Sequence, residues 1–306
     1  MRLLVAGAGA TGGYFGGRLA HAGRDVTFLV REGRAAQLRA GGLEVVSPHG
    51  GFKLTPKLVT AGTVDGTYDA ILLAVKAYSL DGALADLAPA VGPETMILPV
   101  LNGMKHVELL TARFGPEAVA GCLCRIPAHV DEEGRIVQLG KFHDLVYGEM
   151  NGARTPRIEK LDAFMHDAGF RAYLSPAIER EMWEKWVMLA TLAGITCLMR
   201  GSVGEIVGAP GGAEFVNRFL GEAAAVAAAA GHPPSETFLA QTRALLTAKG
   251  SPLTASMFRD LQAGGRIEAD QIIGDLLDKG RQAQVPVPLL ALAYTHLAVF
   301  QNRQAA

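Results

Sequence analysis

The sequence predicts an α/β domain over residues 1–174, followed by an all-α domain over residues 175–306. In the first part, short apolar runs typical of buried strands alternate with helical patterns, which favours a mostly parallel sheet covered on both faces. From about Ser175 onward, almost every segment has helical periodicity. A length of 306 residues is sufficient for two domains of ordinary size, each with its own core.

Four short strands are expected before the first change of pattern. They cover residues 2–6, 25–30, 70–75 and 96–101, and a helix that runs to about Ala22 follows the first of them. Pro99 argues against the fourth strand, because proline cannot donate a hydrogen bond to a neighbouring strand.

After Ala118 the pattern changes to consecutive strands joined by turns, which favours antiparallel pairing. These strands are expected within residues 118–130, 134–140 and 144–150, before a helix near 156–168 and a strand near 170–174.

The second part is expected to consist of helices. One helix ends at Gly231, a typical C-terminal stop, and Pro233 and Pro234 separate it from the next. Three further helices are expected over residues 235–249, 267–279 and 288–302. Their alanine- and leucine-rich faces could form a homodimer interface or pack internally, and the sequence leaves both open.

Composition and charge exclude several classes of partner. The 29 lysine and arginine residues are balanced by 30 aspartate and glutamate residues, so no basic surplus indicates a nucleic acid or an anionic membrane. The uncharged run 186–199 is too short to span a bilayer. The eight histidines lack a metal-ligand spacing, so no metal is expected. Neither a disulfide framework nor a zinc site matches the cysteines, which favours the reduced cytoplasm: Cys122, Cys124 and Cys197.

A glycine-rich segment, GAGATG at residues 7–12, follows the first strand and opens the first helix. This context is typical of a Rossmann-type dinucleotide-binding loop, in which the first glycine permits a tight turn. The second lets the backbone approach a pyrophosphate, and the third allows close packing of the helix on the strand. The pyrophosphate is expected at the helix N-terminus. All six residues are candidate cofactor ligands: Gly7, Ala8, Gly9, Ala10, Thr11 and Gly12.

Arg31 directly follows the second strand, where NAD-binding sites usually carry an acidic residue for the ribose hydroxyls. An arginine suits a 2′-phosphate instead, because its planar guanidinium can form two charge-assisted hydrogen bonds. Arg34 and Glu32 are close by. The sequence therefore favours NADPH over NADH as the cofactor.

Two polar residues follow the third and fourth predicted strands. Ligands of parallel sheets bind outside the carboxyl ends of the strands, so Lys76 and Asn102 are candidates to line the cofactor site. Each alone has an ordinary explanation, a solvated lysine and an Asn-Gly turn. Lys185, at the head of the apolar run 186–199, is either a lysine that reaches to water or one held for chemistry.

The order of these motifs resembles the ketopantoate reductase (2-dehydropantoate 2-reductase) family over nearly the whole chain. The resemblance implies a Rossmann-type domain followed by a helical domain like that of 6-phosphogluconate dehydrogenase. It also implies NADPH-dependent reduction of 2-dehydropantoate (ketopantoate) to pantoate, on the route to pantothenate and coenzyme A. The motifs are the glycine loop, Val75-Lys76, Asn102-Gly103, Trp183-x-Lys185, Ser256-Met257-x-x-Asp260 and Arg266-x-Glu268-x-Asp270.

The resemblance also implies roles for the matched residues. Lys185 corresponds to the catalytic lysine of the family, Glu268 to its glutamate and Ser256 to a serine that contacts the substrate. Asn102 and Lys76 match residues beside the nicotinamide and the substrate. These roles fit the chemistry, because hydride transfer to a carbonyl leaves negative charge on oxygen, which a protonated lysine stabilises and then neutralises.

Three positions depart from the family pattern. Leu189, Ala193 and Val203 stand where the family carries asparagines, so polar contacts to the hydroxyl of ketopantoate are missing. Thr196 faces the same side of the helix as Lys185 and could replace one contact, although a core threonine is favoured. The departures leave open a more apolar 2-oxo acid as substrate, and also an NADP-binding regulator without catalysis.

A hydroxyacid or opine dehydrogenase that depends on a histidine is a further alternative. No histidine is convincingly placed for it, and His106 is expected at the surface. Asp260 and Asp270 fit the family pattern, but capping or structural bonding is as good an explanation for them as substrate contact.

Overall fold

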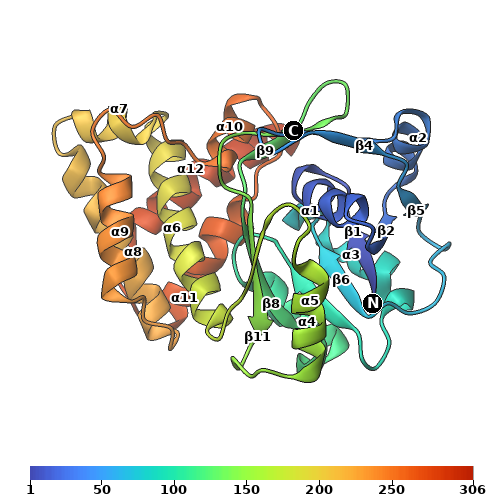
Figure 1. Cartoon of the computed structure of the whole chain (residues 1–306). Coiled ribbons are helices and arrows are strands. Elements are labelled where there is room, and N and C mark those ends of the chain that lie inside the picture. Colours follow the sequence, from blue (N-terminus) through green and yellow to red (C-terminus); the bar gives the residue numbers. More distant parts are fainter. Residues whose placement is uncertain (306) are drawn as a thin grey trace. The chain divides into compact units, whose positions relative to one another are not determined.

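The computed structural model describes residues 1–305, and the chain forms two compact units (Figure 1). The first unit comprises Met1–Leu101 and His106–Glu179, and the second comprises Asn102–Lys105 and the chain from Arg180 onward. The units therefore divide inside helix α6 (Ile178–Met199), whereas the sequence suggested a boundary between residues 174 and 175. The short excursion at Asn102–Lys105 places one of the candidate site residues with the helical unit.

A five-stranded parallel sheet forms the centre of the first unit and confirms the predicted α/β class. Its order is β5-β2-β1-β6-β7, so the chain leaves β1 (Arg2–Ala6) in one direction and later returns to its other side. Ala6 lies opposite both Leu29 and Leu73, so the carboxyl ends of three adjacent strands meet at one edge. The other strands are β2 (Asp25–Leu29), β5 (Lys57–Val59), β6 (Ala70–Leu73) and β7 (Met96–Pro99).

Pro99 is compatible with the sheet because β7 is a terminal strand of the order and Pro99 is its last residue. A proline at such a position removes no hydrogen bond from a central ladder. The fourth predicted strand thus exists but is shorter than residues 96–101.

The remaining strands form two smaller sheets rather than one continuous series. The expected antiparallel pairing is confirmed for β9 with β10 and for β8 with β11, but each pair belongs to a different sheet. The sequence patterns did not reveal β3, β4 and β5. The sheets are β4-β3-β10-β9 and β12-β11-β8, with β3 (Leu43–Val46), β4 (Phe52–Leu54), β8 (Ala120–Arg125), β9 (Ala128–Val130), β10 (Ile136–Gln138), β11 (Asp144–Glu149) and β12 (Arg171–Leu174).

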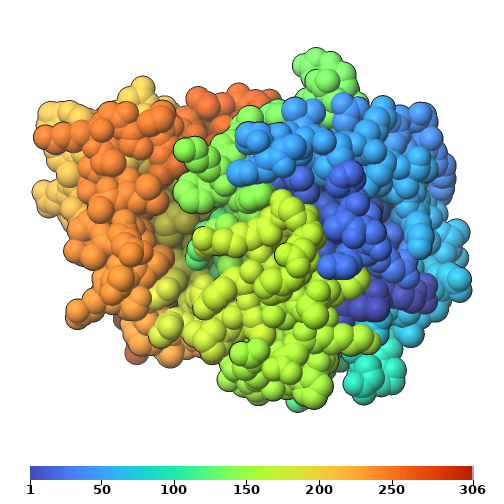
Figure 2. Space-filling model, viewed as in Figure 1, coloured from blue at the N-terminus to red at the C-terminus, as the bar shows by residue number. Residues whose placement is uncertain are grey.

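Helices cover the sheets of the first unit. In Figure 2, the yellow-green segment that includes helix α5 lies on its surface. The Thr155 hydroxyl caps α5 by accepting a hydrogen bond from the Ile158 amide. The helices are α1 (Ala10–His21), α2 (Glu32–Gly41), α3 (Leu80–Leu87), α4 (Lys105–Phe114) and α5 (Pro156–Met165), with short 3-10 turns at Ala77–Ser79, Ala88–Ala90 and Pro116–Ala118.

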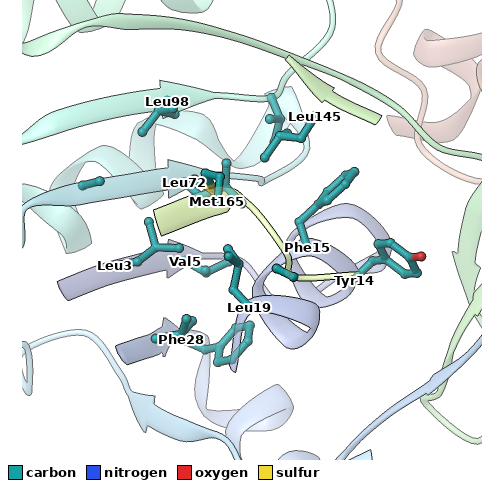
Figure 3. Close-up of a cluster of buried hydrophobic side chains, with 14 of the residues drawn as sticks. Leu3, Val5, Tyr14, Phe15, Leu19, Phe28, Leu72, Leu98, Leu145 and Met165 are labelled. Carbon is teal, nitrogen blue, oxygen red and sulfur yellow. The ribbon is translucent and has the colours of Figure 1, made fainter. Parts of the chain in front are cut away.

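Helix α1 is packed on both sides. Its Phe15 and Leu19 join a buried cluster with side chains of β1, β2, β6, β7, β11 and α5, part of which is drawn in Figure 3. Arg18 of the same helix is only 6% exposed and donates hydrogen bonds to the Ser47 hydroxyl and the His49 and Gly50 carbonyls. These contacts hold the helix that follows the glycine loop.

The described part of the second unit is helical, which confirms the predicted class. A regular helix was predicted over residues 267–279. The structure instead has a π-helical turn, η4 (Asp270–Gly274), followed by the α-helix α11 (Asp275–Gln282). Among residues 1–305, no helix combines the length and the apolar character needed to cross a membrane. The other helices are α7 (Val203–Gly208), α8 (Gly212–Ala229), α9 (Glu236–Leu246), α10 (Ser256–Gln262) and α12 (Pro288–Ala305).

Candidate active site

The glycine loop lies between β1 and α1, where the order of the parallel sheet reverses. Gly7 has φ +99°, and a Cβ atom there would lie 2.9 Å from the Ala74 carbonyl oxygen. A Cβ at Gly12 would overlap the Gly7 carbonyl oxygen and lie 2.8 Å from the Ala74 Cβ. Both glycines are therefore required by the packing of the loop itself, and the loop lies directly against the end of β6.

Gly9 has a different environment. It is exposed, and a Cβ there would meet no other atom within 4 Å. The packing of the chain thus does not explain a glycine at this position, whereas close approach of a ligand to the backbone would. The Gly13 amide donates the first helical hydrogen bond, to the Gly9 carbonyl, so the preceding amides of α1 take no part in helical bonding. This N-terminus is suited to an anion.

Three charged residues after β2 have separate roles. Arg31 is exposed, and its guanidinium forms no hydrogen bond or ion pair with any residue from 1 to 305, while the nearby Glu32 pairs with Arg39 at 3.5 Å. Arg34 is half-buried and donates from Nε to the Ala8 carbonyl at 3.2 Å. It also donates from Nη2 to the Gly134 carbonyl at 3.1 Å. Arg34 therefore stabilises the glycine loop, whereas the guanidinium of Arg31 remains able to bind a ligand.

Lys76 follows β6 by a few residues and is exposed. Its segment lies next to the glycine loop, since a Cβ at Gly7 would also lie 3.2 Å from Cγ1 of Val75. The structure thus brings together the loop 7–12 and the end of β6, two of the features that the sequence assigned to the cofactor site.

Lys185 lies on α6 between three anchored neighbours. The Trp183 ring stacks on His232 with a centroid distance of 4.7 Å. The Glu184 carboxylate accepts hydrogen bonds from the amide and the hydroxyl of Ser235. The Trp186 indole donates from Nε1 to the Ile272 carbonyl at 2.9 Å. Lys185 itself is half-buried, and within the described chain its ammonium has no hydrogen-bond or ion-pair partner. A rigid helical turn therefore presents a lysine with an uncommitted ammonium.

The Asn102-Gly103 turn packs on the π-helical turn η4. Gly103 has φ +85°, and a Cβ there would lie 2.5 Å from the Gln271 carbonyl oxygen and 3.8 Å from Nε1 of Trp186. Asn102 is half-buried beside this contact, and Glu268, which is 7% exposed, lies just before η4 in the chain. The segments that carry Lys185, Asn102 and Glu268 are thus brought together around one turn.

Ser256 is the first residue of α10 and is exposed. The loop that leads to it is tied to α7, because the Val203 and Gly204 amides donate to the Leu253 and Ser251 carbonyls. A Cβ at Gly204 would lie 2.5 Å from the Ser251 nitrogen. The Val203-Gly204 pair therefore positions the chain before Ser256 through its backbone.

Comparison with known proteins identifies the family of the chain. A family model described as ketopantoate reductase PanE/ApbA matches residues 3–152, and its C-terminal counterpart matches residues 177–301. The chain belongs to the ketopantoate reductase family. It is an oxidoreductase that acts on a CH–OH group.

Individual relatives match along nearly their full length. A Bacillus subtilis (strain 168) protein named uncharacterized oxidoreductase YkpB is 36% identical over 301 residues, covering 98% of this chain and 99% of that protein. A 2-dehydropantoate 2-reductase of Halobacterium salinarum is 27% identical over 295 residues, 95% of each chain. The crystal structure of 2-dehydropantoate 2-reductase from Geobacter metallireducens GS-15 superposes with a TM-score of 0.87 and 28% identity, covering 97% of this chain and 99% of that one.

The three positions at which the resemblance implies asparagines carry apolar side chains that are buried or half-buried. Leu189 is half-buried one turn after Lys185, and Ala193 is 2% exposed a further turn on. The Thr196 hydroxyl donates to the Leu192 carbonyl at 2.6 Å. This confirms a core threonine, because its hydroxyl is bonded within its own helix. Val203 is fully buried.

Two other expectations can be compared with the structure. The expectation that His106 lies at the surface is wrong: it is 3% exposed in the first turn of α4, so its ring packs inward. Asp270 has a structural role, since its carboxylate accepts hydrogen bonds from the Tyr294 hydroxyl and the Gln301 amide of α12. Sequence reasoning did not identify Trp186 or Arg34 as part of the site. Their signals were weak, an indole next to Lys185 and a second arginine after β2.

Proposed function

We propose that this protein reduces the C2 carbonyl of a 2-oxo acid with NADPH. 2-Dehydropantoate is the leading substrate and pantoate the product, in pantothenate biosynthesis. The observation that carries the proposal is Lys185, whose uncommitted ammonium projects from an anchored turn of α6. Relatives named 2-dehydropantoate 2-reductase, which match nearly the whole chain, support this substrate.

The residues of the first unit fit a dinucleotide with a 2′-phosphate. Gly9 leaves its backbone accessible at the N-terminus of α1, which suits a pyrophosphate. The guanidinium of Arg31 has no other partner in residues 1–305 and suits the 2′-phosphate, whereas Glu32 is paired with Arg39. We therefore propose NADPH rather than NADH, with Lys76 and Asn102 toward the nicotinamide end.

NADPH supplies a hydride to the carbonyl carbon when it is bound. Lys185 would stabilise the negative charge that develops on the carbonyl oxygen and donate a proton from Nζ, so that hydride and proton together give the alcohol. Glu268 would orient the ammonium of Lys185. Ser256 and Asn102 would hold the carboxylate and the carbonyl of the substrate by hydrogen bonds.

The test is NADPH oxidation with ketopantoate and a panel of other 2-oxo acids. Lys185→Ala should lower kcat by roughly 100- to 10,000-fold, the usual size of a general-acid contribution, while NADPH binding measured by fluorescence stays unchanged. Lys249→Ala, which changes an exposed lysine of the second unit, is the matched control. Absence of turnover with every acid would refute the proposal, and tight NADPH binding without turnover would instead indicate a regulator.

A second candidate is an NADPH-dependent reductase of a more apolar 2-oxo acid. It is favoured by the face of α6 beyond Lys185, where Leu189 and Ala193 offer no hydrogen bond and the Thr196 hydroxyl is bonded to Leu192. A hydroxyl placed against such a face would lose its hydrogen bonds to water without replacement.

The two candidates differ in the ratio of kcat/KM for ketopantoate to that for 2-oxoisovalerate, which lacks the hydroxyl. Leu189→Asn restores one hydrogen-bonding amide and should raise this ratio, by about 10-fold if one neutral hydrogen bond of about 1–1.5 kcal/mol forms. Leu189→Met, which preserves volume and apolarity, should leave the ratio unchanged.

Location and assembly remain predictions. The three cysteines are free thiols, which fits the cytoplasm. A homodimer is the assembly to be checked, by light scattering of the purified chain.

A further inference from the structure

The π-helical turn η4 contacts both α6 and the Asn102-Gly103 turn. In a π-helix the hydrogen bonds span five residues rather than four, and here the Asp275 amide donates to the Asp270 carbonyl. The widened turn places two successive carbonyls against segments far away in sequence. The Ile272 carbonyl accepts from the Trp186 indole, and the Gln271 carbonyl lies against Gly103.

Trp186 is 1% exposed, and its indole N–H forms a buried hydrogen bond. A buried indole needs such a partner, because an unsatisfied N–H in the core is costly. An aromatic ring without an N–H group, such as phenylalanine, could fill the same space in the core. The N–H therefore has a more specific effect, which is to fix the register of α6 against η4 one residue after Lys185.

Gly103 depends on the same turn. With φ +85° and the Gln271 oxygen so close, only glycine fits, and the turn of η4 therefore determines where Asn102 lies. Glu268 is connected to η4 by a backbone hydrogen bond, in which the Ile272 amide donates to the Glu268 carbonyl at 3.1 Å.

From these contacts we infer that Trp186 is a positioning residue, which holds Lys185 in register with Asn102 and Glu268 through η4. The inference rests on the proposed role of Lys185 in reduction. The other anchors of this turn, Trp183 on His232 and Glu184 on Ser235, bind α6 to the chain before α9. Trp186 is thus the anchor that links the lysine to the other two segments.

Trp186→Phe removes the donor and retains most of the ring. We expect kcat to fall about 10- to 100-fold, the effect of a small misplacement of a catalytic group, with KM for NADPH within about twofold of the original value. The matched control is Thr191→Val, which removes a buried hydroxyl of the same helix that donates to the Val187 carbonyl. It should leave kcat unchanged.

A second readout does not depend on turnover. Hydrogen exchange of residues 102–105 and 268–275 should accelerate in Trp186→Phe and not in Thr191→Val, because only the former releases the Ile272 carbonyl. If Trp186→Phe fails to fold, Gly103→Ala replaces it and should give the same loss of kcat by displacing Asn102. Unchanged kcat and unchanged exchange in these segments would overturn the inference. A wild-type protein that reduces no 2-oxo acid, with exchange responding as expected, would refute only the proposed function.

Discussion

Replacement of Arg31 by alanine tests the cofactor assignment directly. Arg31 is exposed, and its guanidinium has no hydrogen-bond or ion-pair partner in residues 1–305, so removal of this side chain leaves no buried group unsatisfied and should not affect folding. A hydrogen bond to a charged group contributes about 1.5–3 kcal/mol, and solvent screening at an exposed site favours the lower end. About 1.5–2 kcal/mol corresponds to a rise of roughly 10- to 30-fold in KM for NADPH.

The assay is steady-state oxidation of NADPH and of NADH by Arg31→Ala and by the original protein. KM for NADH should change by less than about twofold, because NADH lacks the 2′-phosphate that Arg31 would bind. The effect on NADPH should shrink as ionic strength rises. Arg113→Ala, which changes another exposed arginine of the first unit, serves as control. Equal effects on both cofactors, or none, would refute the reasoning.

Substitutions in the glycine loop and in one buried ion pair test the packing of the first unit. Gly9→Ala should fold normally, because its Cβ meets no atom within 4 Å, but it should weaken NADPH binding. Gly12→Ala should destabilise the fold, because its Cβ overlaps the Gly7 carbonyl oxygen. Calorimetry measures the stability of each variant, and NADPH titration measures its affinity for the cofactor. Normal NADPH binding by a folded Gly9→Ala would count against the assignment of residues 7–12 to the cofactor site. Arg157→Met should lower the free energy of unfolding by about 3 kcal/mol in urea titrations, because it removes the guanidinium that binds the buried Glu149 carboxylate through two hydrogen bonds. The same guanidinium lowers the pKa of Glu149 below its usual 4.5, so this stability is present above pH 4.5 and is lost as pH falls through the lowered pKa. The loss between pH 5 and pH 3 should therefore be smaller in Arg157→Met, and an identical pH dependence would contradict the assignment.

The local features of the site were predictable from the sequence because each depends on neighbouring residues. A strand, the glycines at 7, 9 and 12 and a helix specify a loop of one kind, which lies between β1 and α1 in the structure. The preference for NADPH, which rests on Arg31, stays a prediction. Pro99 showed the limit of this reasoning, because whether a strand tolerates proline depends on its place in the sheet. The antiparallel pairs were predictable, but their division between two sheets was not, since it depends on where distant strands such as β3 lie.

Local sequence patterns were sufficient to predict the fold class, the glycine loop and the order of motifs that contains Lys185. They could not show which side chains are bonded to distant segments. The carboxylate of Asp270 binds side chains of α12, and Arg34 donates hydrogen bonds to the Ala8 and Gly134 carbonyls. Trp186 and Ile272 are 86 residues apart in the chain, and the carbonyl that binds the indole belongs to a π-helical turn with no signature in local periodicity. Such long-range hydrogen bonds follow from the packing of whole helices, which local sequence patterns do not specify.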